Sequence, residues 1–236
     1  MKTKGFIPRT WRFIKRTFLV LFIIQICYII LLKWVNPLFT ITQLQSLLTG
    51  NELKREYINW NEMPVNARLA VIAAEDQLFA DHSGFDWKSI DKAISYNKKI
   101  PNRVRGASTI SQQVAKNVFL WQGRSWLRKA LEMYFTFMIE LLWGKKRILQ
   151  VYLNVAEMGK GIFGIEAAAR HHFKKPALKL SRHETAMIAA CLPNPERYTV
   201  KPVSRHVAGR YPWILRQMNN LQNDPDIKRI ISSPDQ

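Results

Sequence analysis

Two short stretches near the middle of the chain concentrate side chains that can carry out acid–base and anion-binding chemistry. Residues 75–86 read EDQLFADHSGFD, and residues 106–117 read GASTISQQVAKN. Carboxylates, amides, hydroxyls and a cation are so dense there that burying them in an ordinary core would be costly. The two stretches therefore indicate a site that handles a polar, anionic substrate.

Glu75 is the candidate general base. It follows the apolar stretch 69–74 and is expected near the C-terminal end of a helix, where the negative end of the helix dipole raises the pKa of a carboxyl group. A carboxyl group held near neutrality is what a general base needs. The alternative is an exposed terminal glutamate, solvated beside Asp76.

The second stretch places polar side chains on one side of a helical turn. Lys116 comes three residues after Gln113 and four after Gln112. With Ser108 and Asn117, they could line a groove that hydrogen-bonds sugar hydroxyls or diphosphate oxygens. The alternative is a helix with an ordinary solvated face.

A third polar group follows at Arg124, Arg128, Lys129 and Glu132. Arg128 and Glu132 are spaced as an i,i+4 ion pair, and such pairs are common on helix surfaces. None of the three groups alone would indicate an enzyme.

Charge and hydropathy restrict the partners. The 236 residues include 36 Lys and Arg against 17 Asp and Glu, a formal charge of +19 that favours an anionic partner. The apolar run 17–32 predicts a membrane-spanning helix over 13–35, with a cleaved signal peptide as the alternative. Lys and Arg precede this run without any acid, so the positive-inside rule places the N-terminus in the cytoplasm. The remainder would then lie across the membrane, which argues against a nucleic-acid partner.

Beyond this span, the apolar periodicity predicts an all-α domain of many short helices and no convincing strand. Thr109 with Gln112 and Ser181 with Glu184 fit capping boxes at two helix starts. Neither Cys27 nor Cys191 is expected to form a disulfide. The expected helices cover 65–75, 87–97, 109–119, 125–143, 146–154, 162–173, 181–192 and 204–221.

Taken together, in order and at this spacing, the motifs resemble the signatures of monofunctional peptidoglycan glycosyltransferases, which are relatives of the glycosyltransferase domains of bifunctional penicillin-binding proteins. E-D-x-x-F-x-x-H-x-G-x-D matches 75–86, G-x-S-T-x-x-Q-Q-x-x-K-N matches 106–117, and R-K-x-x-E matches 128–132. Residues 146–154 resemble a fourth motif, with Gln150 where many members carry Glu. The resemblance covers about 61–198.

This resemblance implies a lysozyme-like fold and an enzyme that polymerises lipid II, an undecaprenyl-diphosphate disaccharide-pentapeptide. The 4-hydroxyl of the acceptor would attack the anomeric carbon of the growing chain, giving a β-1,4 bond with inversion and releasing undecaprenyl diphosphate. Glu75 corresponds to the general base. Glu132 corresponds to a second glutamate that assists departure of the diphosphate, through a divalent cation or by orienting nearby cations.

The remaining site residues follow from the same resemblance. Lys116 and Arg124 would balance the diphosphate charge, and the other expected substrate-binding residues are Asp76, Ser108, Gln113, Asn117 and Arg128. No organic cofactor is implied, whereas Mg²⁺ or Mn²⁺ is compatible with the chemistry.

The apolar span, its flanking charges and the resemblance together divide the chain into a cytoplasmic basic tail (1–12), a transmembrane anchor (13–35), a membrane-proximal segment (36–60) and a periplasmic glycosyltransferase domain (61–236). The expected location is the bacterial inner membrane. The expected partners are lipid II, the growing glycan strand, membrane lipids and cell-division or cell-wall synthesis proteins. Two alternatives remain open: a membrane-anchored lysozyme-like lytic enzyme that cleaves glycan strands, and an inactive scaffold for cell-wall assembly.

Overall fold

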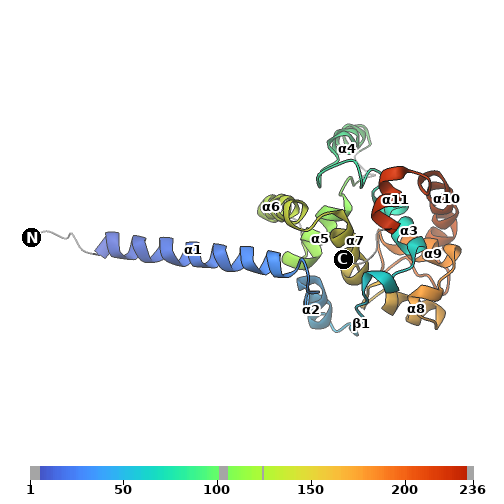
Figure 1. Ribbon diagram of the computed structural model, residues 1–236, viewed down its shortest axis with the longest axis horizontal. Coiled ribbons are helices and arrows are strands. Elements are labelled where there is room, and N and C mark those ends of the chain that lie inside the picture. Colours follow the sequence, from blue (N-terminus) through green and yellow to red (C-terminus); the bar gives the residue numbers. More distant parts are fainter. Residues whose placement is uncertain (1–5, 101–105, 124, 233–236) are drawn as a thin grey trace, which may run out of the picture. The chain divides into compact units, whose positions relative to one another are not determined.

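The structure is a computed structural model that describes residues 6–100, 106–123 and 125–232 (Figure 1). The chain divides into two compact units, one ending at Asn36 and the other beginning at Pro37.

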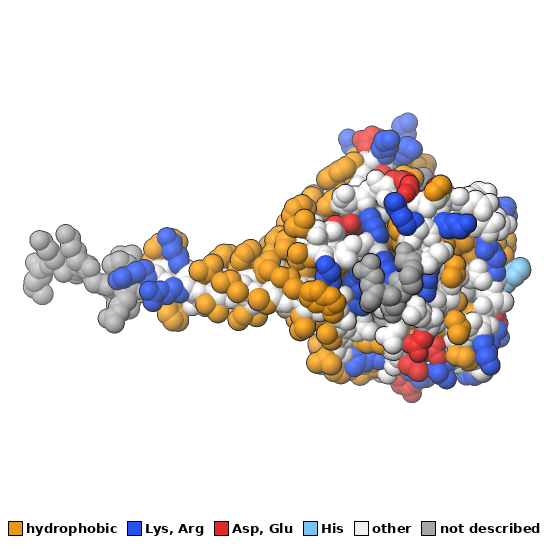
Figure 2. Space-filling view, viewed as in Figure 1, with side chains coloured by type: hydrophobic (Ala, Val, Ile, Leu, Met, Phe, Trp, Pro, Cys, Tyr) orange, Lys and Arg blue, Asp and Glu red, His pale blue; other side chains and the backbone are white. Residues whose placement is uncertain are grey.

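The first unit contains one long apolar helix, α1 (Phe6–Leu31). Its segment Thr10–Leu31 is 22 residues long and contains an 18-residue window with a mean hydropathy of 2.0, long enough to cross the hydrocarbon core of a bilayer at about 1.5 Å per residue. Figure 2 shows apolar side chains along this helix, with Lys and Arg side chains nearer its N-terminal end. The helix fits a membrane anchor. It ends at Leu31 and not at Val35 as expected, and the chain turns before Pro37, which disfavours helical conformation in the residue before it.

In the second unit the regular structure is almost entirely helical, which confirms the all-α prediction. The helices are α2 (Ile41–Leu48), η1 (Trp60–Glu62), α3 (Val65–Glu75), α4 (Trp87–Lys99), α5 (Ile110–Phe119), α6 (Trp126–Leu142), α7 (Lys145–Val155), α8 (Ile165–Phe173), η2 (Ala177–Lys179), α9 (Arg182–Cys191), α10 (Arg205–Leu221) and α11 (Pro225–Ser232).

The helices of this unit form two groups around a buried central helix. On one side α3 packs against α9, α10 and α11, and on the other α5 packs against α2 and α6 (Figure 1). Helix α7 contacts α5, α6, α8 and α11, and is buried over most of its surface. A helix that is buried all round forms the core of its domain. Helices α3 and α5, which carry the two main motifs, thus belong to different groups.

One predicted helix begins later than expected. Ile162–Phe163 is a short strand, β2, which pairs in parallel with β1 (Lys54–Arg55), and helix α8 begins at Ile165. Two residues are too few to show the alternating pattern from which a strand is predicted. Gly161 permits the close approach of the two strands, because a Cβ atom there would lie 2.0 Å from the carbonyl oxygen of Glu52.

Side-chain caps fix where several helices begin. The capping boxes of Thr109 with Gln112 and of Ser181 with Glu184 are present as predicted. Thr40 and Gln43 form another at the start of α2, a helix that the sequence analysis did not predict. Helix α2 is part of the second compact unit, which begins at Pro37.

Candidate active site

Glu75 is the last residue of α3, as the sequence analysis predicted. Its side chain is partly buried, and its Oε2 accepts a hydrogen bond from Nε2 of Gln113 on α5 at 2.8 Å. Burial raises the pKa of the Glu75 carboxyl group, while the hydrogen bond from Gln113 and the charges of Arg210 and Lys116 act in the opposite direction. The group is thus a stronger base than a solvated glutamate and lies among donors that hold it in place.

Asp76 ties together the two segments that carry the main motifs. The residue is 7% exposed, and its Oδ2 accepts a hydrogen bond from the backbone N–H of Ile110, in the first turn of α5, at 3.0 Å. His82 donates from Nε2 to Oδ1 at 2.9 Å, because its Nδ1 accepts the N–H of Gly84 at 3.1 Å. The carboxylate is therefore engaged within the protein. This geometry favours a bracing role for Asp76 over the direct substrate contact that we expected.

Gly84 fixes the same loop against α5 and α6. It has a φ of +89°, and a Cβ atom there would lie 2.8 Å from Cγ2 of Thr136 on α6. Its carbonyl oxygen accepts a hydrogen bond from Oγ1 of Thr109 at 2.7 Å. Only glycine combines this backbone conformation with such close packing, which explains the glycine in the first motif.

A cavity of about 790 Å³ opens at the end of α3. Glu75 and Asp76 line it together with Ser108 and Gln113, which brings four of the predicted site residues together. Two cations that the sequence analysis missed, Lys92 and Arg210, also line it. The remaining lining residues are Ala74, Gln77, Leu78, Asp86, Ser89, Gly106, Ala107, Thr109, Pro193 and Trp213.

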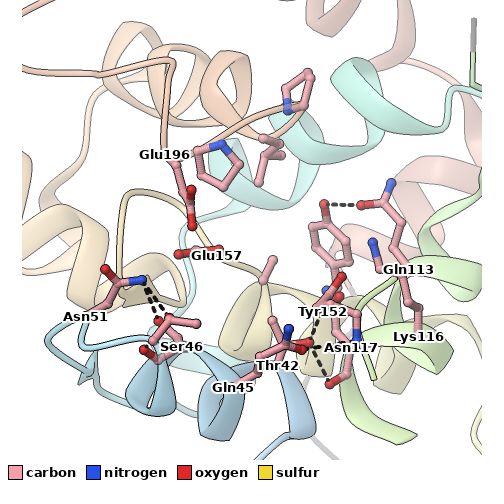
Figure 3. A pocket seen from close by; sticks show the side chains of 16 residues that line it. Thr42, Gln45, Ser46, Asn51, Gln113, Lys116, Asn117, Tyr152, Glu157 and Glu196 are labelled. Atoms are coloured by element: carbon pink, nitrogen blue, oxygen red, sulfur yellow. Dashed lines mark hydrogen bonds between the residues drawn. The ribbon is translucent and has the colours of Figure 1, made fainter. Parts of the chain in front are cut away.

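A second cavity, of about 400 Å³, shares Gln113 and Pro193 with the first (Figure 3). Lys116, Asn117 and Tyr152 line it, and helix α2 and the residues just after it add a wall of hydroxyl and amide groups from Thr42, Gln45, Ser46, Thr49 and Asn51. Glu157 and Glu196 stand on another side, and burial together with the charge of Glu196 raises the pKa of Glu157. The two cavities form a cleft of two halves that meet at Gln113.

Glu132 lies among cations on α6 and lines neither cavity. Its side chain is 4% exposed, Arg128 Nη1 lies 3.1 Å from Oε2, and Lys129 bonds the other oxygen. Burial lowers the pKa of Lys116, whereas the charges of Glu132 and Glu75 raise it. Lys116 is thus a partly buried cation influenced by both glutamates.

The residues around Glu132 do not offer a ligand set for a divalent cation. Both carboxylate oxygens already bind Arg128 and Lys129, and the described part of the chain contains no group of three His, Cys, Asp or Glu side chains placed to hold a metal. The geometry instead fits the other expectation for Glu132, that it orients nearby cations.

Not all predicted site residues meet in the cleft. Ser108, Gln113, Lys116 and Asn117 line it, Arg128 lies with Glu132 outside it, and Arg124 falls outside the described residues. Sequence reasoning missed Arg210 because no motif marks it. Arg210 lies on α10, with its Cζ 3.7 Å from the centroid of the Trp213 ring. Only the packing of α10 against the rest of the unit brings this side chain to the cleft.

Comparison with known proteins gives consistent matches. Residues 41–219 match the family model described as Transglycosylase. A biosynthetic peptidoglycan transglycosylase of Stutzerimonas stutzeri (strain A1501) is 48% identical over 223 residues, covering 92% of each chain. Relatives of the same name from Yersinia pseudotuberculosis (serotype O:3, strain YPIII) and Yersinia pestis (strain Pestoides F) are each 56% identical over 182 residues, 76% of each chain.

Proposed function

The chain belongs to the transglycosylase family and is a peptidoglycan glycosyltransferase with the lysozyme-like fold of that family, and from this premise we propose that it polymerises lipid II into glycan strands. The observation that carries the proposal is Glu75, a carboxylate of raised pKa in a cleft that also contains cations.

Glu75 is the general base in this proposal. It takes the proton from the 4-hydroxyl of the acceptor GlcNAc as that oxygen attacks the anomeric carbon of the growing chain. The new β-1,4 bond forms on the face opposite to the departing group, so the configuration inverts. Undecaprenyl diphosphate leaves with the electron pair of the broken bond. The hydrogen bond from Gln113 holds the Glu75 carboxylate in one orientation for this transfer.

Cations balance the charge that develops on the diphosphate. Lys116 is the cation best placed by burial and by its position beside Glu75 and Glu132. In the proposal Glu132 orients Arg128 and Lys129 through its two ion pairs, so the glutamate acts through these cations. Arg124 completes this group in the proposal on the basis of the sequence motif.

The two halves of the cleft suit different parts of the substrates. The larger cavity contains Glu75 with Lys92 and Arg210, so we assign the acceptor and its diphosphate to it. The smaller cavity presents hydroxyls, amides and two carboxylates with Lys116 as the cation, and it suits the sugars of the growing chain. Gln113 stands where the two substrates would meet.

Helix α1 supports a membrane anchor with a cytoplasmic N-terminus and a periplasmic catalytic domain at the bacterial inner membrane. An anchored enzyme meets a lipid-linked substrate at a raised effective concentration. Protease added to intact spheroplasts should then degrade the residues after Asn36. Protection until the cells are lysed would reverse the proposed orientation.

The activity is tested by incubating the full-length protein in detergent with lipid II and separating the products by gel electrophoresis, before and after lysozyme digestion. We expect polymer that lysozyme degrades. If lipid II stays intact while finished glycan strands become shorter, the protein is a lytic enzyme. Activity on neither substrate would leave the scaffold role.

A further inference from the structure

Three side chains from three helices form a hydrogen-bonded chain that ends at Glu75. Tyr152 on α7 donates from Oη to Oε1 of Gln113 at 3.1 Å, a contact visible in Figure 3. Gln113 on α5 then donates from Nε2 to Oε2 of Glu75 at 2.8 Å. Tyr152 lines the smaller cavity but is only 1% exposed, so its side chain is almost fully buried.

The orientation of the Gln113 amide decides what Glu75 encounters. An amide presents a donor at one end and an acceptor at the other, and a half-turn exchanges them. In the observed orientation the amino group stabilises the ionised carboxylate. The reversed orientation would set a carbonyl oxygen against it, which disfavours ionisation.

The Tyr152 hydroxyl opposes this reversal. Within the described residues, Oε1 of Gln113 is the acceptor to which this hydroxyl donates. Turning the amide over would leave the buried hydroxyl hydrogen without that acceptor, and an unsatisfied buried donor is costly. Burial raises the pKa of Tyr152 well above its ordinary value, so the hydroxyl keeps its proton throughout the neutral range.

From this geometry, and resting on the proposed function of Glu75 as the base, we propose that Tyr152 is a positioning residue: it holds the Gln113 amide so that its amino group faces the Glu75 carboxylate. It touches neither reacting atom and acts through Gln113. The three residues lie on different helices, so the spacing within the sequence motifs does not reveal this contact.

Other charged or titratable groups also influence Glu75, but a change at Tyr152 leaves them in place. They are the adjacent Asp76, Lys116 on α5, Arg210 on α10 and Cys191 on α9. Burial raises the pKa of Cys191 to about 12, so the thiol does not ionise near neutral pH. The hydroxyl of Tyr152 can therefore be removed alone, without changing any of these charges.

The test is the pH dependence of kcat/KM for Tyr152→Phe. Glu75 must be ionised to act, so activity falls as pH drops through its pKa. Without the hydroxyl, the ionised form loses support, and the acidic limb should move to higher pH by about half a unit to one unit. Well above this limb, where Glu75 is ionised in both proteins, most of the activity should return. A purely structural defect would lower the rate equally at every pH, and that result would overturn the proposal.

A matched control is available in Tyr57, whose Oη donates to Oε1 of Gln43 at 3.2 Å and which lines neither cavity. Tyr57→Phe should leave the acidic limb unchanged. Gln113→Met should shift the limb by itself, and adding Tyr152→Phe to it should produce no further shift. Equal shifts in both backgrounds would show that Tyr152 acts independently of Gln113.

A titration that needs no turnover separates this inference from the proposed function. Infrared difference spectra between the full-length protein and Glu75→Gln report the Glu75 carboxyl group directly, and its pKa should be higher in Tyr152→Phe and in Gln113→Met. Should Tyr152→Phe fail to fold, 3-fluorotyrosine at position 152 tests the same contact, because its more acidic hydroxyl donates more strongly to Gln113 and should lower the Glu75 pKa. An unchanged titration in a protein that polymerises lipid II overturns the inference only. A shifted titration in a protein without polymerase activity overturns the proposed function only.

Discussion

Glu75→Gln should lower the rate of glycan polymerisation by about a hundredfold to ten-thousandfold, the range that general base catalysis contributes. Glutamine keeps the size of the side chain and can still pair with Gln113 through its carbonyl oxygen, so the fold and the cleft should persist. The variant lacks only the group that accepts the proton. Lipid II should therefore still bind while the polymer fails to form.

Initial rates of polymerisation and a separate measurement of lipid II binding distinguish a loss of catalysis from a loss of substrate binding. Glu62→Gln is a matched control, because Glu62 is exposed on η1 and lines neither cavity. In the unaltered enzyme, burial raises the pKa of Glu75, so the acidic limb should lie above the ordinary range of a glutamate, about 4.3. Retention of most of the activity in Glu75→Gln would exclude this residue as the base.

Lys116→Met should reduce kcat by about a hundredfold to a thousandfold, the range reported for removal of one group that stabilises developing charge. Methionine fills similar space without the cation. The loss should fall mainly on kcat, because the diphosphate acquires its additional charge as the glycosidic bond breaks. Burial lowers the pKa of Lys116, so activity in the unaltered enzyme should also decline as pH rises through that value.

Steady-state kinetics over a range of lipid II concentrations separate kcat from KM for this variant. Lys179→Met on η2 removes an exposed lysine that lines neither cavity and serves as the control for net charge. An increase in KM with kcat unchanged would mean that Lys116 contributes to ground-state binding alone.

Features of the site that depend on local sequence could be predicted. The apolar stretch before Glu75 predicted a helix that ends at this residue, and the spacing of Thr109 and Gln112 predicted where α5 begins. Both depend on contacts between residues a few positions apart. The ion pair of Arg128 with Glu132 belongs to the same class, since a single helical turn brings the two together.

Features that depend on packing between distant segments could not be predicted. Nothing in the first motif reveals that Asp76 caps the first turn of α5, because Ile110 offers only its backbone N–H. Arg210 reaches the cleft by way of α10, far along the chain from both motifs. Tyr152 occurs in a recognisable motif, but its hydrogen bond to Gln113 appears only when α7 lies against α5.

The hydrogen bonds between α2 and the end of α5 determine at which residue a truncated, soluble form of this enzyme should begin. Oγ1 of Thr42 donates to the backbone oxygen of Asn117, and the side chains of Thr42 and Gln45 accept hydrogen bonds from Gln122. A protein cut at Asn61, where the sequence motifs begin to match, would lose this wall and expose the side of α5 behind Lys116. Removing only the residues up to Asn36 keeps the cleft whole, and inhibitor screening without detergent should start from that shorter deletion.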